Sequence, residues 1–114
     1  MARFVVAPGG QVAGRLRVPG DKSISHRALM FAAIASGRTR VTGFLEGEDC
    51  LSTLQAVARL GVTVQRPCPG EVIVAGVGLQ GLRAPQGVLD MGNAGTAMRL
   101  FMGLLAAQPF DSEL

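Results

Sequence analysis

The sequence predicts an α/β domain in which short strands alternate with helices. Of its 114 residues, 48% are hydrophobic and 17% are charged, a balance that favours a folded core over a disordered chain. Sixteen glycines, with phenylalanine as the only aromatic residue type, indicate a core of small aliphatic side chains and close backbone approaches. Along the chain, short β-like runs alternate with longer stretches that carry helical patterns.

Three segments carry helical patterns with suitable ends. The first and third are apolar nearly all round, which predicts burial over most of their surface. The second follows the acidic residues 46–49, whose charges suit a helix N-terminus, and its single apolar stripe predicts a half-exposed helix. Gly37 at the C′ position, Gly61 and Pro109 are expected to end the three helices in turn. The predicted helices span about residues 23–35, 50–60 and 93–107.

Short β-like runs precede and separate these helices. The runs at 62–65 and 71–74 are predicted to form a hairpin across residues 66–70, which contain two prolines and a glycine. The resulting order is βαβαββ followed by the start of another βα unit, which indicates one structural repeat and the opening of the next. Strands are expected at residues 15–18, 39–44, 62–65, 71–74 and 87–91.

Positive charge is concentrated in the first third of the chain. Residues 1–40 carry seven basic side chains and one acidic one, whereas residues 41–114 carry four and seven. There is no basic run and Lys22 is the only lysine, so small phosphorylated ligands fit better than nucleic acid. No apolar run reaches the roughly 18 residues that span a bilayer, and the first residues lack a signal-peptide pattern. We therefore expect a soluble cytoplasmic protein without membrane partners.

A glycine-bearing turn at residues 19–23 leads into the first predicted helix. The free N–H groups and partial positive charge of a helix N-terminus can hold a phosphate or carboxylate. Lys22 adds a mobile cation and Ser23 a hydroxyl, and Arg27 lies one turn further on the same face as Ser23. The alternative is that Asp21 or Ser23 is only an N-cap and that both cations are solvated. Local spacing leaves both interpretations open.

A second turn of the same kind, at residues 92–96, leads into the third predicted helix. Asn93 is a candidate helix cap, Gly95 allows a ligand to approach the backbone, and Thr96 adds a hydroxyl. Simple capping, with Gly95 packed against a neighbouring element, is the alternative here. Two anion-ready helix ends would suit two anionic ligands held side by side.

Other possible motifs are set aside. Residues 76–81 match G-x-G-x-x-G, but the segment that follows contains Pro85 and cannot begin a dinucleotide-binding helix. Residues 20–23 lack the glycine spacing of a P-loop. His26 is expected to be structural or to support other residues, and Cys50 and Cys68 are expected to be reduced and inert, with no metal-ligand spacing.

Two stretches resemble the N-terminal signatures of the 5-enolpyruvylshikimate-3-phosphate synthase family. They are VPGDKSISHRA at 18–28 and LDMGNAGTAMR at 89–99, in the family's order and separation. The resemblance implies the enolpyruvyl transferase fold, whose lobes are inverted α/β barrels built from βαβαββ repeats. Residues 1–18 would then be a strand region of the other lobe, and residues 19–114 part of a substrate-binding lobe.

The resemblance implies transfer of the enolpyruvyl group from phosphoenolpyruvate to the 5-hydroxyl of shikimate 3-phosphate, with release of phosphate. It implies a cytoplasmic shikimate-pathway enzyme, monomeric when complete, without metal or organic cofactor. Lys22 would touch both substrates, and Ser23 and Arg27 would hold shikimate 3-phosphate. Asn93 and Gly95 would border phosphoenolpyruvate, and Gly95 marks where the inhibitor glyphosate competes.

The family's chains are several times longer, so we expect about one repeat here and a chain that is inactive and poorly soluble by itself. Further substrate ligands and acid/base groups would lie beyond Leu114, which leaves Lys22 as the only catalytic candidate. One alternative is a non-catalytic phosphate-binding remnant. Another is a relative that acts on UDP-N-acetylglucosamine, although the stretch at 22–27 argues against that branch.

Overall fold

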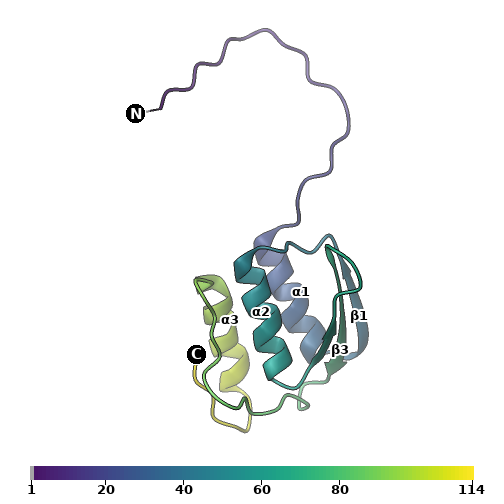
Figure 1. Ribbon diagram of the computed structural model, residues 1–114, viewed down its shortest axis with the longest axis vertical. Helices are drawn as coiled ribbons and strands as arrows, with labels where there is room; N and C mark the ends of the chain where they lie inside the picture. The colour runs from purple at the N-terminus through teal and green to yellow at the C-terminus, as the bar shows by residue number, and fades with distance from the viewer. Residues whose placement is uncertain (1) are drawn as a thin grey trace.

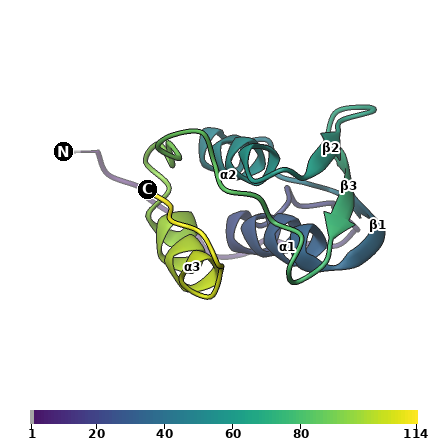
Figure 2. The ribbon, with the colours of Figure 1, turned by 90° about the horizontal axis from the view of Figure 1, so that it is seen from below.

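The computed structural model describes residues 2–114 as three helices and a three-stranded sheet. Two of the helices, α1 and α2, pack side by side against one face of the sheet, and α3 lies on their far side (Figure 1; Figure 2). The predicted α/β class, the three helices and the strands at 39–44, 62–65 and 71–74 are therefore confirmed in their order along the chain. The elements are α1 (Lys22–Ile34), β1 (Ser36–Thr42), α2 (Glu48–Arg59), β2 (Thr63–Gln65), β3 (Glu71–Val77) and α3 (Gly95–Ala106).

The sheet is antiparallel, with β3 in the centre and the strand order β1-β3-β2. β2 and β3 form the predicted hairpin, in which Val64 pairs with Val74. The other edge of β3 pairs with β1 from Ser36↔Val77 to Thr42↔Glu71. Val72 and Val74 are fully buried, as the two-residue period of a strand with one covered face requires.

The C-terminal end of α1 differs from the expected glycine stop. The helix ends at Ile34, and Ala35 is already extended and leads directly into β1. The carbonyl of Ala35 accepts a hydrogen bond from the Gly78 N–H at 3.0 Å, and a Cβ on Gly76 would collide with the same carbonyl. Gly37 instead lies within β1 with φ +94°. The end of α1 is therefore held by its close packing on β3 and not by a glycine at the C′ position.

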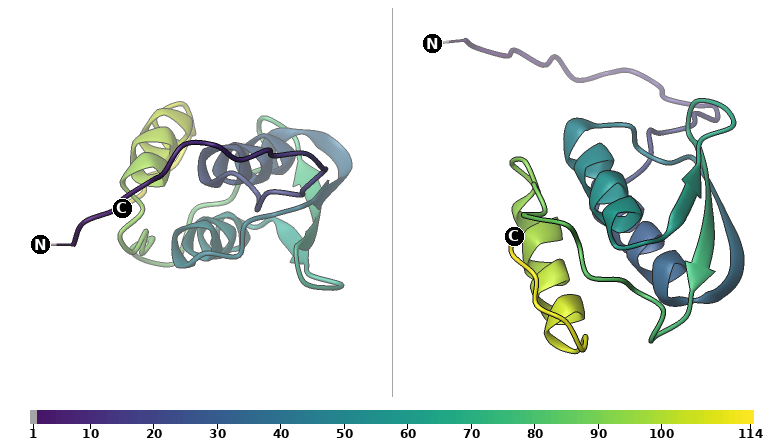
Figure 3. Two further views of the ribbon diagram at one scale, coloured as in Figure 1. Left: turned by 90° about the horizontal axis from the view of Figure 1, so that it is seen from above. Right: turned by 60° about the horizontal axis from the view of Figure 1, so that its bottom comes forward.

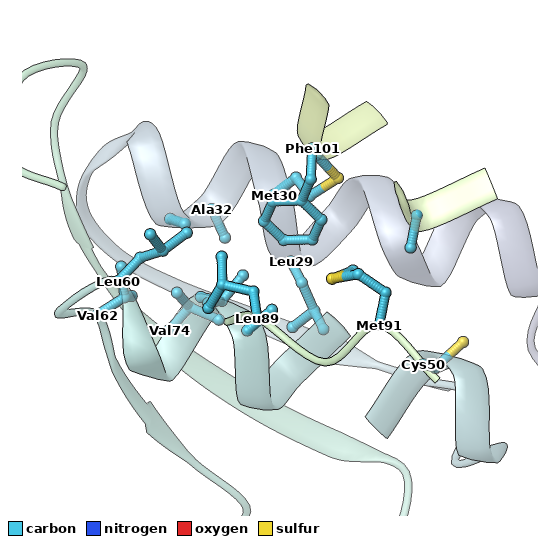
Figure 4. Packing of buried hydrophobic residues seen from close by; sticks show 14 of the residues in the cluster. Leu29, Met30, Ala32, Cys50, Leu60, Val62, Val74, Leu89, Met91 and Phe101 are labelled. Atoms are coloured by element: carbon cyan, nitrogen blue, oxygen red, sulfur yellow. The ribbon is translucent and has the colours of Figure 1, made fainter. Parts of the chain in front are cut away.

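The core lies between the sheet and the helices, and Figure 4 shows its labelled members in close packing. The run at 87–91, expected to be a strand, has no strand pairing. It crosses the molecule as an extended segment whose Leu89 and Met91 side chains are buried in the core. The Leu89 N–H donates to the Glu113 carbonyl at 2.8 Å, so this buried residue pairs its amide with the C-terminal segment and not with the sheet.

Two further expectations are wrong for residues 2–114. Residues 15–18 form no strand, because the described chain before the turn at residues 19–23 extends away from the folded part and has no strand beside it (Figure 3). α1 and α3 are not covered all round: Phe31 is 67% exposed and Met102 58%. One face of each helix packs, and the described chain provides nothing to cover the other. No helix in residues 2–114 has the length and apolar character needed to cross a membrane.

Candidate functional site

The three helices run in the same direction, so their N-terminal ends lie at one edge of the molecule (Figure 1). Both predicted anion-binding turns are therefore brought to the same edge, since one precedes α1 and the other precedes α3. The aligned peptide dipoles place the partial positive charges of all three helices there. This common orientation is what the sequence alone did not establish.

The turn before α1 is held by close backbone packing. A Cβ on Gly20 would collide with the carbonyl oxygen of Gly43, so only glycine fits this approach. Ser25 strengthens the junction, because its hydroxyl donates to the Asp21 carbonyl at 2.7 Å and accepts from the Leu45 N–H at 3.1 Å. The Asp21 carboxylate caps the helix by accepting from the Ile24 N–H at 2.7 Å. The two interpretations of this turn, helix capping and ligand binding, are therefore compatible. Asp21 caps the helix, and the side chains of Lys22 and Ser23 are not used for capping.

Lys22 forms an ion pair with Asp49 in the first turn of α2. The Lys22 side chain is 54% exposed and that of Asp49 21%. The hydrogen bond and negative charge of Asp49 raise the pKa of Lys22, so the ammonium stays charged at neutral pH. An ion pair this exposed contributes little to stability, and an anionic ligand can compete for the lysine.

Ser23 and Arg27 lie on the same helix as Lys22. Ser23 is half-buried and Arg27 is exposed, and among residues 2–114 neither takes part in an ion pair. Arg27 also borders a hollow of about 190 Å³ between α1 and α3, whose apolar wall includes Leu100 and Leu104. Arg27 thus lies on the side of α1 that faces α3.

The turn before α3 differs from its prediction in one respect. Ala94, not Asn93, occupies the N-cap position, and no side chain caps this helix. The turn is instead formed by Asp90, whose carboxylate accepts from the Gly92 N–H at 2.8 Å, with Gly92 at φ +56°. Asn93 and Gly95 are both exposed. Gly95, the first residue of α3, donates its N–H to the Asn93 carbonyl at 3.2 Å, so a backbone group and not a side chain meets this end of the helix.

The first turn of α2 connects the two predicted turns. Asp49 holds Lys22, and a Cβ added to Gly92 would lie 3.0 Å from the Ser52 hydroxyl oxygen. The acidic residues at 46–49 were interpreted from the sequence only as favourable charges at a helix start. The sequence signal for the ion pair is limited to the acidic first turn of α2, because the placement of α2 beside α1 is a tertiary feature.

A shallow pocket of about 260 Å³ beside Lys22 is lined by Leu45, Gly47 and the first residues of α2. A larger hollow, of about 600 Å³, lies between α3 and the C-terminal segment and includes none of the predicted site residues. Both cysteines are free, as expected, with Cys50 buried and Cys68 exposed. Burial raises the pKa of the Cys50 thiol, and the hydrogen bond to Glu71 raises that of Cys68, so neither is activated.

Comparisons of this chain with known families, sequences and structures all point to the same family. The family model of EPSP synthase (3-phosphoshikimate 1-carboxyvinyltransferase) matches residues 6–114. The 3-phosphoshikimate 1-carboxyvinyltransferases of Alkalilimnicola ehrlichii and Nitrosococcus oceani are 61% and 62% identical over 111 and 108 residues, which are 97% and 95% of this chain. These matches cover 25% and 24% of the two relatives, so the chain spans about a quarter of their length.

A solved structure of EPSP synthase from Acinetobacter baumannii superposes with a TM-score of 0.82 at 61% sequence identity. The match covers 87% of this chain and 22% of that one. The fold of three helices and a three-stranded sheet is thus that of a part of a known synthase structure, as one repeat of that fold would be. The chain belongs to the EPSP synthase (3-phosphoshikimate 1-carboxyvinyltransferase) family.

Proposed function

We propose that this chain supplies part of the substrate site for enolpyruvyl transfer from phosphoenolpyruvate to the 5-hydroxyl of shikimate 3-phosphate. The observation that carries the proposal is that two cations, Lys22 and Arg27, lie in the N-terminal half of α1. The chain that contains them belongs to the EPSP synthase family. A phosphate monoester fits this end because it can accept from the helix N–H groups and from both cations.

Each site residue has a distinct part in the proposal. Lys22 leaves Asp49 and contacts both substrates, and Ser23 and Arg27 bind shikimate 3-phosphate. Asn93 and Gly95, at the start of α3, border phosphoenolpyruvate. The shared orientation of α1 and α3 supports this division, because it lets the two anions lie side by side at one edge.

In this reaction the 5-hydroxyl gives up its proton and its oxygen bonds to the central carbon of phosphoenolpyruvate, while the methylene carbon takes up a proton and a tetrahedral intermediate forms. That carbon then loses a proton and the C–O bond to phosphate breaks, which restores the double bond and releases phosphate. Positioning of two anions is the work this chain's residues can do. In this proposal Lys22, which contacts both substrates, is the catalytic candidate among the residues of this chain. The remaining acid/base groups belong to the three quarters of the relatives that this chain does not cover.

Residues 1–18 are proposed to belong to the second lobe of the complete enzyme, and residues 19–114 to the substrate-binding lobe. The exposure of Leu16 at 84% and Val18 at 71% supports this, since apolar residues at alternate positions suit a strand with a partner sheet. We further propose that the complete enzyme is monomeric and acts in the cytoplasm.

Binding is the appropriate test, because the chain spans a quarter of its relatives. Titration of the folded chain with shikimate 3-phosphate, followed by calorimetry, is expected to show saturable binding that Lys22→Met or Arg27→Ala weakens about tenfold or more. Arg38→Ala removes an equally exposed arginine from β1 and is the matched control, expected to bind like the unaltered chain. Equal affinity in all four proteins, or no binding by a demonstrably folded chain, would contradict a retained site.

A further inference from the structure

Two contacts join α1 to α2, one above the other. Lys22 and His26 are four residues apart on α1, and Asp49 and Thr53 are four residues apart on α2, so each pair shares a helix face. At the helix ends the Lys22 ammonium pairs with the Asp49 carboxylate. One turn deeper, His26 Nδ1 lies 2.7 Å from Thr53 Oγ1. The outer contact is exposed, whereas His26 and Thr53 are both fully buried.

The available hydrogen-bond donors indicate which atom carries the hydrogen in the His26–Thr53 contact, here called the inner contact. Thr53 Oγ1 lies 3.3 Å from the Asp49 carbonyl and has a single hydrogen to donate. If that hydrogen goes to the carbonyl, then Nδ1 carries the imidazole proton and donates to Thr53. His26 Nε2 is buried and has no partner in residues 2–114. An unpaired acceptor there costs less than an unpaired N–H, which favours the Nδ1–H tautomer.

The Lys22–Asp49 ion pair, here called the outer contact, cannot by itself hold α1 against α2 while a ligand binds. Under the proposed function, Lys22 must release Asp49 to reach its ligand. At that moment the hydrogen-bonded connection that remains between the first two turns of α1 and α2 is the His26–Thr53 contact, with the long Cys50 Sγ to Lys22 carbonyl contact at 3.7 Å beside it. His26 immediately precedes Arg27 on α1, so a contact that fixes the helix backbone at His26 also fixes the point from which the arginine side chain extends.

We infer that His26 and Thr53 are positioning residues for the phosphate-binding end of α1. Their buried hydrogen bond holds the helix on α2 while Lys22 exchanges Asp49 for the ligand. This inference rests on the proposed function for the identity of the ligand. The inner contact itself can be tested without any ligand.

The first test uses the fact that His26 is the only histidine. In a ¹⁵N-histidine-labelled chain the imidazole nitrogen shifts are expected to report the neutral Nδ1–H tautomer. Thr53→Val is expected to abolish that preference and to speed hydrogen exchange of the amides of residues 25–27 about tenfold, as loss of a buried hydrogen bond implies. Thr53→Ser, which keeps the hydroxyl, should retain the tautomer and the protection. Thr63→Val, on an exposed strand position, is the matched control.

The second test measures affinity for shikimate 3-phosphate in the same proteins. Thr53→Val and His26→Leu are expected to raise the dissociation constant about tenfold. His26→Asn should restore most of the affinity, because its amide can occupy the place of Nδ1.

The outcomes separate the two proposals. If the unaltered chain does not bind shikimate 3-phosphate but the tautomer and exchange results hold, the proposed function fails and the positioning contact stands. Unchanged exchange in Thr53→Val, or equal ligand affinity in every folded variant of a chain that binds, would overturn the inference.

Discussion

The imidazole Nδ1 of His26 lies 2.7 Å from the hydroxyl oxygen of Thr53, in a contact where both residues are fully buried. The histidine immediately precedes Arg27, and the threonine lies four residues after Asp49, which holds Lys22. A buried polar contact thus lies directly under the charged groups proposed to bind substrate. Burial is also the main cause that lowers the pKa of His26, so the imidazole is neutral at neutral pH.

This lowered pKa predicts a pH dependence of stability. A base whose folded pKa lies below its unfolded value of 6.5 binds fewer protons when folded. The contribution of His26 to the free energy of unfolding should therefore be constant above pH 6.5 and fall as the pH drops below it, towards the folded pKa. Denaturant unfolding at a series of pH values checks this.

The same series in His26→Asn isolates the histidine. Hydrogen bonds from Arg66 and Arg40 lower the pKa values of Glu46 and Glu71, so these carboxylates contribute to the pH dependence below about pH 4.5. Between pH 6.5 and 4.5 the dependence should flatten in the variant. An equally steep decline with and without His26 would show that other groups cause it.

Glycines that lie near the site should differ sharply in their tolerance of a methyl group. Gly20→Ala would force a Cβ against the Gly43 carbonyl and is expected to cost about 1–3 kcal/mol of unfolding free energy. Gly103→Ala, with nothing within 4 Å of the new Cβ in the middle of α3, should stabilise by about 0.5–1 kcal/mol. Thermal melts of the two variants distinguish them. A Gly20→Ala chain as stable as the unaltered one would contradict the close approach.

Asp49 should control the titration of Lys22. Asp49→Asn removes the hydrogen-bonded charge that raises the lysine pKa, so the pKa is expected to fall towards the ordinary lysine value. Because Lys22 is the only lysine, one ¹³Cε signal reports its titration without assignment. Glu48→Gln, which neutralises the neighbouring carboxylate, serves as the control. An unchanged lysine pKa in Asp49→Asn would exclude the ion pair.

Gly95→Ala should affect ligands and leave the fold intact. A Cβ there meets only the Arg99 guanidinium, at 3.4 Å, so the chain has room for it. In a complete family enzyme that carries this segment, we expect the inhibition constant for glyphosate to rise about tenfold. The KM for phosphoenolpyruvate should rise less, because the substrate is smaller at this point. Equal changes in the two constants would refute the prediction.

Much of the fold was predictable because local patterns and tertiary packing agree. The helical stripes, the prolines and glycine at 66–70 and the alternation at 71–74 locate three helices and a hairpin. The strand expected at 15–18 did not form, since a strand needs a partner that residues 2–114 do not provide. At 87–91 an apolar run indicated burial correctly but could not distinguish a strand from an extended core segment.

The site was predictable as two helix ends but not as an arrangement. Turn chemistry located Lys22 and Gly95, whereas only the three-dimensional structure showed that their helices point the same way. The partners Asp49 and Thr53 lie 27 residues from Lys22 and His26 respectively, on a helix whose rotation the sequence leaves undetermined. Contacts between elements depend on that rotation, which is why they were missed.

The most direct test follows the Lys22 ¹³Cε signal while shikimate 3-phosphate is added to the folded chain. We predict a saturable shift as the ammonium leaves Asp49 for the phosphorylated ligand, a much smaller one with shikimate that lacks the phosphate, and a weakened one in Arg27→Ala. A lysine signal that stays constant through the titration, in a chain shown to be folded, would contradict a substrate site at the end of α1.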